Sequence, residues 1–461
     1  MRRFLLRGFG MVAKLGRSQE FDDRQIKLMR MLGVGVVLWC PGEWAENEKT
    51  QGQYSMSPEV RRVINVLAES NIQIMVGLFR KNNLYANPLD PDAFARYCVW
   101  VVKALKNEPI AAYQIWNEPS NFDFRSYYGG PWNSRGDAPW LYSFVALMGK
   151  AAHAIKRADP HATVLVNLEG PPLVYALRTR PHDFADIDGV SIHPYAGQFP
   201  PEQVPWGGTK NYLRDGVAVA DSDGSMISSL RFQADDYPRQ YLGRVLQTWV
   251  TEYGFPTCDP AARSEHFKCV SPREQAAFHA RGMILGFSQG ARLWSVYELT
   301  DEGVNRSDPE QNFGITSSAA SGYFPKPAFL TLQRIARILG FNWSYLFKPP
   351  ATLATSDGST GAQQDSEASR APTVSGPQMA WFSTERGYAG FIWRAGPYDD
   401  ATTEALVTVR AGLAPLPRRV LATDLVTGQT LRPTIGGKRD ALVIDHLPLG
   451  SRPVALELLQ R

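Results

Sequence analysis

Two glutamates stand at the ends of strand-like segments that are far apart in the sequence. Glu118 lies in Trp116-Asn117-Glu118-Pro119, directly after the apolar run 110–115, and Glu252 ends the β-prone segment 248–251 just before a tyrosine and a glycine. A carboxyl group at a strand end, next to a loop-opening proline or glycine, is displayed at a site. Two such carboxyls are the residue types for the acid/base and nucleophile pair that cleaves glycosidic bonds.

The elements that must position these glutamates alternate between strand-like and helix-like patterns. Continuous Val/Ile/Leu runs predict strands within 8–15 and at 34–39, 72–78, 111–116, 163–168, 189–193, 247–252 and 291–297. Apolar residues at helical spacing predict helices at 22–32, 58–70, 91–106, 140–158, 172–178, 271–289 and 325–339. A long irregular segment, 197–236, interrupts the series. With this segment in the place of the sixth helix, the pattern amounts to eight strand-then-helix units.

Eight such units predict a (β/α)8 barrel of class α/β, with a doubly wound sheet as the alternative. Strands without polar alternation fit a parallel sheet that is buried on both faces. In a barrel, catalytic residues come from the C-terminal ends of strands. Glu118 and Glu252 would end the fourth and seventh strands, so the same pattern supports the fold and the chemistry.

The sequence changes character near residue 340, which predicts a barrel over 1–340 and an antiparallel β-sandwich over 341–461. Short β-prone runs separated by Gly, Pro and Asp turns support the sandwich. They lie at 379–382, 387–393, 405–409, 420–425, 441–444 and 454–459. Residues 351–378 are rich in Ser, Thr, Gly, Gln and Ala, which predicts a linker or a long loop.

Three motifs together resemble the fourth, sixth and seventh strand ends of clan A retaining glycoside hydrolases. They are Trp116-Asn117-Glu118-Pro119, Ser191-Ile192-His193-Pro194-Tyr195 and Trp249-Val250-Thr251-Glu252-Tyr253-Gly254. Within the clan, the chain is most similar to family 39 and to its relatives that act on bacterial exopolysaccharides. The likeness spans about residues 8–339. The segment that follows the second strand in these enzymes is also similar to residues 43–46 and 52–54 of this chain.

The resemblance implies roles for individual residues. Glu118 would be the general acid and then the general base, with a pKa raised by burial or by the second carboxylate. Glu252 would be the nucleophile that forms a covalent glycosyl-enzyme. Asn117 would donate to the sugar 2-hydroxyl, Tyr195 would keep the nucleophile ionised, and His193 would line the same face.

Further candidates for sugar contact are mostly aromatic. Trp294, on the eighth strand, would form the floor beneath the sugar at the cleavage point. Trp44, Trp132 and Trp206 lie in predicted loops and are candidates for outer subsites. Many clan members carry an arginine near the end of the second strand, but residues 36–40 contain none. Arg80, after the third strand, is the candidate substitute.

These observations favour a retaining β-glycosidase that acts on poly- or oligosaccharides, with endo action preferred. Exo action of a β-xylosidase or β-glucosidase type remains open, because long loops either wall a groove or close a pocket. A glycan-binding barrel without activity, an inverting hydrolase and a transglycosylase are the rivals. No Gly-rich phosphate loop follows a strand, which disfavours nucleotide chemistry.

Bulk properties disfavour nucleic acid and membrane as partners, and the resemblance implies a carbohydrate substrate. Lys plus Arg number 49 against 45 for Asp plus Glu, and with a net charge of +4 and no basic block, nucleic-acid binding has no electrostatic support. No apolar run is long enough for a membrane span. The seven histidines show no ligand spacing, so neither a metal nor another cofactor is expected. The oligomeric state is not indicated.

The cysteines bear on the compartment. Cys258 and Cys269 bracket a short polar loop. Whether a disulfide between them closes this loop or the two cysteines stay unbonded is open from the sequence. Cys40 and Cys98 lie in apolar contexts that are typical of inert core residues. A signal peptide needs a continuous apolar segment. The first residues do not provide one, because Arg7, Gly8, Gly10 and Lys14 interrupt it, so no signal peptide is predicted at the start. The candidate disulfide gives a slight preference for a periplasmic or extracellular location.

Overall fold

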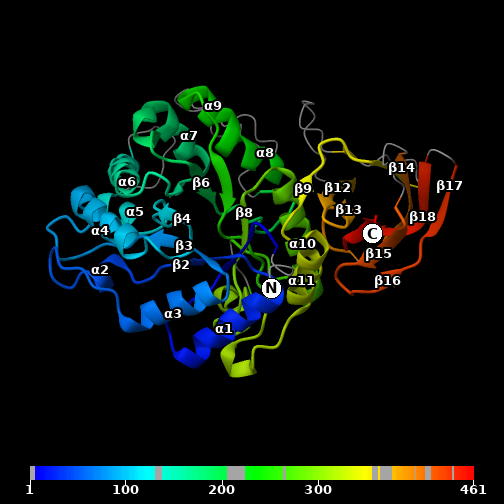
Figure 1. Cartoon of the computed structure of the whole chain (residues 1–461), viewed down its shortest axis with the longest axis horizontal. Helices are drawn as coiled ribbons and strands as arrows, with labels where there is room; N and C mark the ends of the chain where they lie inside the picture. Colours follow the sequence, from blue (N-terminus) through cyan, green and yellow to red (C-terminus); the bar gives the residue numbers. More distant parts are fainter. Residues whose placement is uncertain are drawn as a thin grey trace.

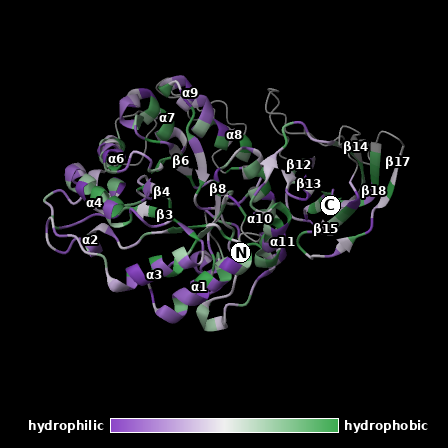
Figure 2. Ribbon diagram, viewed as in Figure 1, coloured by the Kyte–Doolittle hydropathy of each residue, from purple (hydrophilic) through white to green (hydrophobic). Residues whose placement is uncertain are grey.

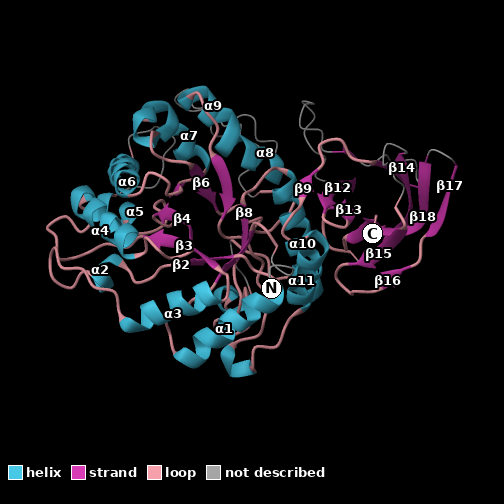
Figure 3. Cartoon of the chain, in the orientation of Figure 1, coloured by secondary structure: helices cyan, strands magenta, loops and turns pink. Residues whose placement is uncertain are grey.

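The computed structural model (Figure 1) describes most of the chain. The described ranges are 6–129, 138–204, 224–262, 266–355, 362–363, 376–399, 401–410, 417–438 and 441–460. Two units follow one another along the sequence. The first is a barrel of strands surrounded by helices, and the second consists of strands only (Figure 3).

Eight parallel strands close into a barrel in sequence order, which confirms the predicted fold class. The strands are β1 (Phe9–Val12), β2 (Val36–Trp39), β3 (Gln73–Leu78), β4 (Ile110–Ile115), β5 (Val164–Asn167), β6 (Gly189–Ile192), β7 (Gln247–Val250) and β8 (Leu293–Val296). Pairing of β1 with both β2 and β8 completes the ring. The doubly wound alternative is therefore wrong.

Eleven helices accompany the barrel among the described residues, and Figure 3 shows them around the strands. They are α1 (Gln19–Leu32), α2 (Trp44–Asn47), α3 (Pro58–Glu69), α4 (Pro91–Ala104), α5 (Phe124–Tyr128), α6 (Pro139–Ala158), α7 (Gly170–Thr179), α8 (Met226–Arg231), α9 (Tyr237–Leu242), α10 (Pro272–Ser288) and α11 (Pro327–Leu339). Side chains of Ser57, Asp90 and Ser271 cap helices that begin with proline, which satisfies free N–H groups of the first turn.

Successive side chains of each barrel strand point alternately into the barrel and outward to the helices. An inner apolar layer consists of Val12, Val36, Leu38, Met75, Ala112, Leu165, Trp249 and Leu293. The neighbours of these residues along the strands, such as Val37 and Trp294, belong to the larger core beneath the helices. Hydrophilic and hydrophobic residues alternate along the ribbons of α1 and α3 (Figure 2), as expected for helices with one face in water.

A polar layer lies above the inner apolar layer, near the C-terminal ends of the strands. The Ser191 hydroxyl donates to Gln114 Oε1 at 2.7 Å and lies 2.6 Å from the Thr251 hydroxyl. Asn167 Nδ2 donates to the Ser191 carbonyl at 3.0 Å. These buried side chains satisfy one another, so the floor of this end of the barrel is fixed by hydrogen bonds.

The C-terminal strands form two sheets that are antiparallel except at the short strand β11, which pairs with β12 in parallel, as expected of a β-sandwich. One sheet has the order β10 (Ala351–Thr355), β14 (Thr402–Arg410), β18 (Ala441–Gly450) and β17 (Thr434–Lys438). The other contains β11 (Ala362–Gln363), β12 (Gly376–Thr384), β13 (Gly387–Ala395), β19 (Val454–Leu459), β15 (Arg419–Asp424) and β16 (Thr430–Leu431), with β9 (Ser344–Tyr345) pairing with β12. In Figure 1 the helices α10 and α11 lie between the barrel and these sheets.

Two expectations about irregular segments need correction. The predicted linker 351–378 begins with a strand, β10, and its last residues belong to β12, because the β-prone residues there find partners in β14 and β13. The segment 197–236 contains α8 and a turn of π-helix, Phe232–Asp236, that leads into α9. The division into units at residue 340 stays a prediction, although helix gives way to strand between Leu339 and Ser344.

Cys258, Cys269 and Cys98 occupy the predicted environments, whereas Cys40 is only partly buried and is not a core residue. Cys258 and Cys269 form a disulfide, which confirms the loop-closing pair. Cys40 and Cys98 are free, and Cys98 is buried. None of the helices in the described ranges combines the length and the apolar composition of a membrane span.

Candidate active site

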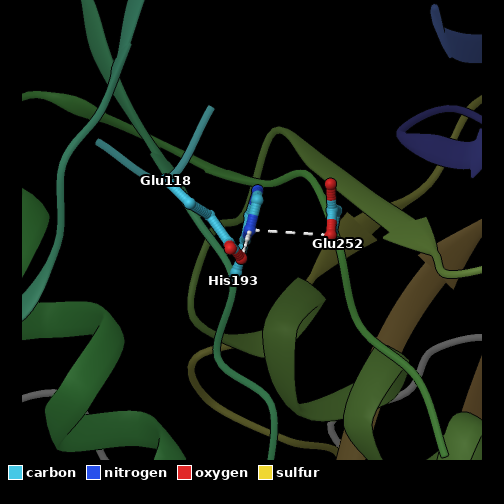
Figure 4. Close-up of side chains that lie close together, drawn as sticks. All are labelled: Glu118, His193 and Glu252. Carbon is cyan, nitrogen blue, oxygen red and sulfur yellow. Dashed lines mark hydrogen bonds and ion pairs between the residues drawn. The ribbon is translucent and has the colours of Figure 1, made fainter. Parts of the chain in front are cut away.

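The two candidate glutamates meet at the C-terminal end of the barrel. Glu118 follows β4 and Glu252 follows β7, and Figure 4 shows His193, from the end of β6, between them. One carboxylate oxygen of each glutamate and one ring nitrogen of His193 all lie within 4.8 Å of one another. The side chain of Glu118 is 21% exposed and that of Glu252 is 14% exposed. Both carboxyls are therefore close together and open to a ligand.

The backbone that presents Glu118 is strained. Trp116 and Glu118 have φ angles of 67° and 44°, in the left-handed region that side chains with a Cβ seldom adopt. The Trp116 ring is buried against Phe94 and Phe124, and the Glu118 N–H donates to Asn167 Oδ1 at 2.5 Å. These contacts hold a conformation that costs energy by itself, a feature that clusters at functional sites.

His193 bridges the two carboxylates. Its Nδ1 lies 3.0 Å from Glu118 Oε1 and 3.6 Å from Glu252 Oε2, and its ring is buried. Burial by itself lowers the pKa of an imidazole. The charge of Glu252 and the hydrogen bond and charge of Glu118 outweigh burial, and they raise the pKa of His193 to about 9. The ring is therefore protonated at neutral pH and donates to Glu118.

The pKa of Glu118 differs from the expectation. Burial raises this pKa, but the hydrogen bond and charge of His193, with a hydrogen bond from Asn121, more than compensate, and the net shift is downward. The expectation of a raised pKa at Glu118 is therefore wrong. The cause is the imidazolium, because it stabilises the carboxylate form. The proton nearest to Glu118 belongs to His193.

Glu252 lies in a different electrostatic environment. Burial raises its pKa, and the charge of His193 and the hydroxyl of Tyr195 reduce that rise without cancelling it. Tyr195 donates to Glu252 Oε2 at 3.0 Å. Its ring packs edge-on against Phe267, Tyr297 and Phe313, which holds the hydroxyl in place. This is the contact that the resemblance implied for Tyr195.

Replacing Tyr195 with Phe tests this contact. Removal of the hydroxyl leaves the packed ring but withdraws a hydrogen bond to the charged form of Glu252. The pKa of Glu252 then rises further, so the acidic limb of kcat/KM moves to higher pH. At neutral pH we expect kcat/KM to fall roughly ten- to hundredfold. A pH–rate profile of Tyr195→Phe whose acidic limb coincides with that of the wild type would contradict this role.

A third carboxyl, Glu169, lies at the same opening and was not predicted. It follows β5, and its Oε2 accepts the backbone N–H of His193 at 3.0 Å. Burial raises the pKa of Glu169 to about 7, and the charges of Glu118 and Glu252 contribute. Its position in Asn167-Leu168-Glu169-Gly170, at the end of the fifth strand, is the same signal that identified Glu118 and Glu252.

A cleft of about 1250 Å³ contains these groups. Asn117 lines it, and the Asn117 amide makes no hydrogen bond within the described ranges, so it is free to bind a ligand. The rim carries the exposed rings of Phe122 and Phe199. The wall is also rich in charged groups, which include Lys14, Glu43, Glu46, Arg80, Arg125 and Glu310.

Two of the tryptophan predictions are wrong. Trp44 and Trp294 have no exposed surface and do not line the cleft. Trp44 begins α2 and packs against Tyr85, Phe94 and Tyr97. Trp294 points outward from β8 toward Tyr253 and α10. Trp132 and Trp206 lie outside the described residues, so their placement stays a prediction.

Strand alternation explains the error at β8. Leu293 belongs to the inner layer and Trp294 to the outer core, so the next aromatic residue on the inner side is Tyr297. Tyr297 lines the cleft and packs against Tyr195 and Phe313. Tyr297, three residues beyond Trp294, is therefore the aromatic side chain that the eighth strand offers to a ligand. The period of two along the strand is the sequence signal that could have identified Tyr297.

Arg80 lies in the cleft wall as predicted, but its partner is not Glu252. Its Nε is 3.2 Å from Glu43 Oε1, and both side chains are nearly half exposed. The cation that acts on Glu252, apart from His193, is Lys14, whose charge lowers the pKa of Glu252. Lys14 follows β1 and also pairs with Glu298 and Glu302. A lysine after the first strand supplies positive charge where the second strand has no arginine.

Glu118, His193 and Glu252 also have the atom types and spacing of metal ligands. In the arrangement described here, Nδ1 of His193 carries the proton that it shares with Glu118. An imidazolium nitrogen has no lone pair for a metal. A metal would have to displace that proton; the hydrogen bonds of the three side chains account for their spacing.

Comparisons with known proteins agree on the fold. The sequence matches no protein-family model, and no curated protein matches it in sequence. Solved structures do match. A family 39 glycoside hydrolase from the gut symbiont Bacteroides cellulosilyticus superposes with a TM-score of 0.68 at 17% identity, over 99% of this chain and 82% of that chain. The chain has the fold of that enzyme.

Two further structures extend the comparison to other glycoside hydrolases. A GH30 endoxylanase from Clostridium papyrosolvens has a TM-score of 0.57 at 11% identity, over 99% of this chain and 97% of that chain. A glucosidase from Croceicoccus marinus has a TM-score of 0.56 at 12% identity, over 99% and 96%. In each case almost the entire chain is matched, so the likeness covers the barrel and the C-terminal sheets together.

Proposed function

We propose that the protein is a retaining β-glycoside hydrolase that acts on poly- or oligosaccharides. One observation carries the proposal: oxygens of Glu118 and Glu252 lie within 4.8 Å of each other across an open cleft. Retaining enzymes hold their carboxyls about 5–5.5 Å apart, whereas inverting enzymes need about 6.5–9.5 Å to admit a water. The fold shared with known glycoside hydrolases adds support.

In the first step, Glu252 attacks the anomeric carbon and the bond from that carbon to the leaving oxygen breaks. The leaving oxygen takes a proton from Glu118, which receives one from His193 Nδ1 through their 3.0 Å hydrogen bond. The negative charge of Glu252 is consumed when the new carbon–oxygen bond forms. That charge helps to raise the pKa of His193. Its loss therefore lowers the pKa of His193, and the imidazolium gives up its proton more readily.

In the second step, Glu118 acts as the base. Its carboxylate takes a proton from a water that attacks the anomeric carbon, and the bond to Glu252 breaks. Glu252 leaves as a carboxylate, stabilised by the Tyr195 hydroxyl. The proton on Glu118 returns to the His193 pair, which restores the starting state. Two displacements at one carbon give net retention.

The cleft favours endo action. Its volume of about 1250 Å³ exceeds what one sugar ring needs, and the exposed rings of Phe122 and Phe199 stand on its rim, on the loops after β4 and β6. Flat aromatic surfaces bind the apolar faces of sugar rings. A chain of sugars can therefore extend past the carboxyl pair. Incubation with a panel of plant and bacterial β-glycans tests this, because oligomer ladders indicate endo action and monosaccharides exo action.

The mechanism has its own test. Product analysis by NMR within the first minutes reports the anomer that is released, and we expect the β anomer. Release of the α anomer from a β-glycan indicates inversion and overturns the proposed mechanism. Binding of a glycan without any turnover indicates a carbohydrate-binding barrel instead.

His193→Asn tests the shared proton. Because the pKa of His193 is raised to about 9, the Glu118–His193 pair holds its proton below that pH and loses it as the pH rises through about 9. Without the imidazole, the proton must reside on Glu118 alone. We expect the alkaline limb of kcat/KM to move down by about one unit or more. Tyr195→Phe is the control, since it shifts the acidic limb only; an unmoved alkaline limb in His193→Asn would exclude the shared proton.

We further propose that the protein works in the periplasm or outside the cell. The disulfide between Cys258 and Cys269 supports this, because such bonds persist in oxidising compartments. A polysaccharide substrate would be met there as well.

A further inference from the structure

A buried ion pair connects the loop after β6 to helix α10 and, through hydrogen bonds, to the C-terminal sandwich. Glu202 is 5% exposed and belongs to the segment 193–204 after β6, which we call the cleft loop. Its carboxylate accepts two hydrogen bonds from Arg281 of α10, a residue with no exposed surface. Acidic and basic side chains are almost never fully buried unless they are paired. Glu202 and Arg281 are therefore a specific structural device of this chain.

The sandwich supplies the remaining partners of this pair. Trp393 of β13 donates its Nε1–H to Glu202 Oε1 at 2.9 Å, and the Gly396 N–H donates to Oε2 at 3.4 Å. Arg281 donates in turn to the carbonyls of Gly396 at 2.7 Å and Ser451 at 3.5 Å. The carboxylate thus receives donors from both the barrel and the sandwich, and the guanidinium bonds to both.

The other end of the cleft loop forms the site. His193 and Tyr195 contact the two catalytic candidates, and residues 197–199 line the cleft, with the Phe199 ring 41% exposed. Only two residues separate Phe199 from Glu202. Near Glu202 the loop is held further by the hydrogen bond from Met226 N–H to the Glu202 carbonyl at 2.9 Å.

We propose that Glu202 is a positioning residue through which the C-terminal sandwich fixes the cleft loop, and that this is a role of the sandwich in glycan binding. The role in glycan binding rests on the proposed function, whereas the fixing of the cleft loop does not. The sandwich acts without touching the glycan: Trp393 and Gly396 complete the hydrogen bonds of a buried carboxylate, and that carboxylate anchors the wall that carries Phe199. Loss of a donor leaves a buried charge undersatisfied, and the loop relaxes toward water.

The chain offers a matched pair of variants for the test. Trp393→Phe removes the donor to Glu202 and keeps an aromatic ring. Trp381→Phe makes the same change in the adjacent strand β12, where the Trp381 Nε1–H is buried without a partner in the described residues. Both variants lose indole volume in the sandwich, so both are expected to unfold at a lower temperature. Only Trp393→Phe is expected to act on the cleft loop.

Hydrogen exchange of the cleft-loop amides in the full-length protein is the main readout, since it needs no substrate. We expect exchange to be at least about tenfold faster in Trp393→Phe and unchanged in Trp381→Phe. Equal exchange in the two variants overturns the proposal. If Trp393→Phe does not fold, Glu202→Gln takes its place, with the same expected exchange and the same control.

Kinetics on 4-nitrophenyl β-D-glucoside or β-D-xyloside tests the link to glycan binding. We expect KM to rise several-fold in Trp393→Phe while kcat changes little, because the carboxyl pair itself is untouched. A fall in kcat at constant KM contradicts a positioning role in binding. If the wild type turns over neither substrate, the proposed function is in question, but the exchange experiment still decides whether the sandwich fixes the loop.

Discussion

Glu252→Gln is expected to abolish turnover while glycan binding persists. The amide has nearly the same size and still accepts a hydrogen bond from Tyr195, but it cannot form the covalent bond to the anomeric carbon. Loss of a covalent catalytic group costs about 10⁴- to 10⁶-fold in kcat. Steady-state kinetics and isothermal titration with an oligosaccharide product measure the two effects separately. A binding barrel without catalysis would show no such loss.

A second variant identifies the chemical role of the residue. In Glu252→Ala, azide can occupy the vacated space and attack the anomeric carbon directly, so that a carbon–nitrogen bond forms as the leaving group departs. One displacement in place of two gives a glycosyl azide of inverted configuration, which NMR identifies. Glu310→Gln is the matched control, since Glu310 also lines the cleft and the proposed steps do not use it. Equal losses in Glu252→Gln and Glu310→Gln would refute the assignment.

The sequence was sufficient to predict the barrel and the location of the carboxyl pair. Hydrophobic strands that repeat with helices leave few alternatives to a parallel sheet, and the C-terminal strand ends of a closed barrel meet at one opening. Glu118 and Glu252 are 134 residues apart in sequence, and their convergence follows from this rule alone. Glu169 satisfies the same rule, so the sequence also carries the signal for this third carboxyl.

Whether a side chain faces into or out of the barrel is harder to predict than the strand to which it belongs. Trp294 was assigned to the cleft because it lies on the eighth strand, yet a shift of one residue along a strand exchanges the inside of the barrel for the outside. The correct alternation requires knowledge of whether Leu293 or its neighbour Trp294 faces inward, and both side chains are apolar enough to do so. The prediction for Trp44 is wrong for a related reason. Its ring packs against Phe94 and Tyr97 of α4, and no local sequence pattern indicates that contact.

The pKa shifts of the site and the ion pairs between distant residues could not be predicted from the sequence. The downward shift of the Glu118 pKa depends on a 3.0 Å contact with His193, 75 residues away. Glu202 and Arg281 find each other across 79 residues and share partners in the sandwich. Neither residue has a local pattern that distinguishes it from a solvated charge. The segment 351–378 has the composition of a linker, but its first residues form β10, which pairs with the distant β14, and its last residues begin the β12–β13 hairpin.

Glu118→Gln is expected to give a loss that depends on the leaving group. Natural glycans have poor leaving groups that need a proton, so removal of the acid is expected to lower kcat/KM about 10²- to 10⁴-fold. An aryl glycoside such as 2,4-dinitrophenyl β-D-glucoside or xyloside needs no proton, so its first displacement proceeds at nearly the wild-type rate. The second displacement then lacks its base and becomes slow, which predicts a burst of dinitrophenol followed by a low steady rate.

The two substrates together separate acid/base catalysis from simple damage to the site. A misfolded or distorted cleft lowers both rates by similar factors and gives no burst. Azide discriminates further, because it attacks the glycosyl-enzyme without a base: in Glu118→Ala it is expected to restore the steady rate and give a product of retained configuration. That configuration is opposite to the one expected from Glu252→Ala. The same anomer from both variants would show that Glu118 and Glu252 do not act on opposite faces of the sugar, and the double displacement would have to be abandoned.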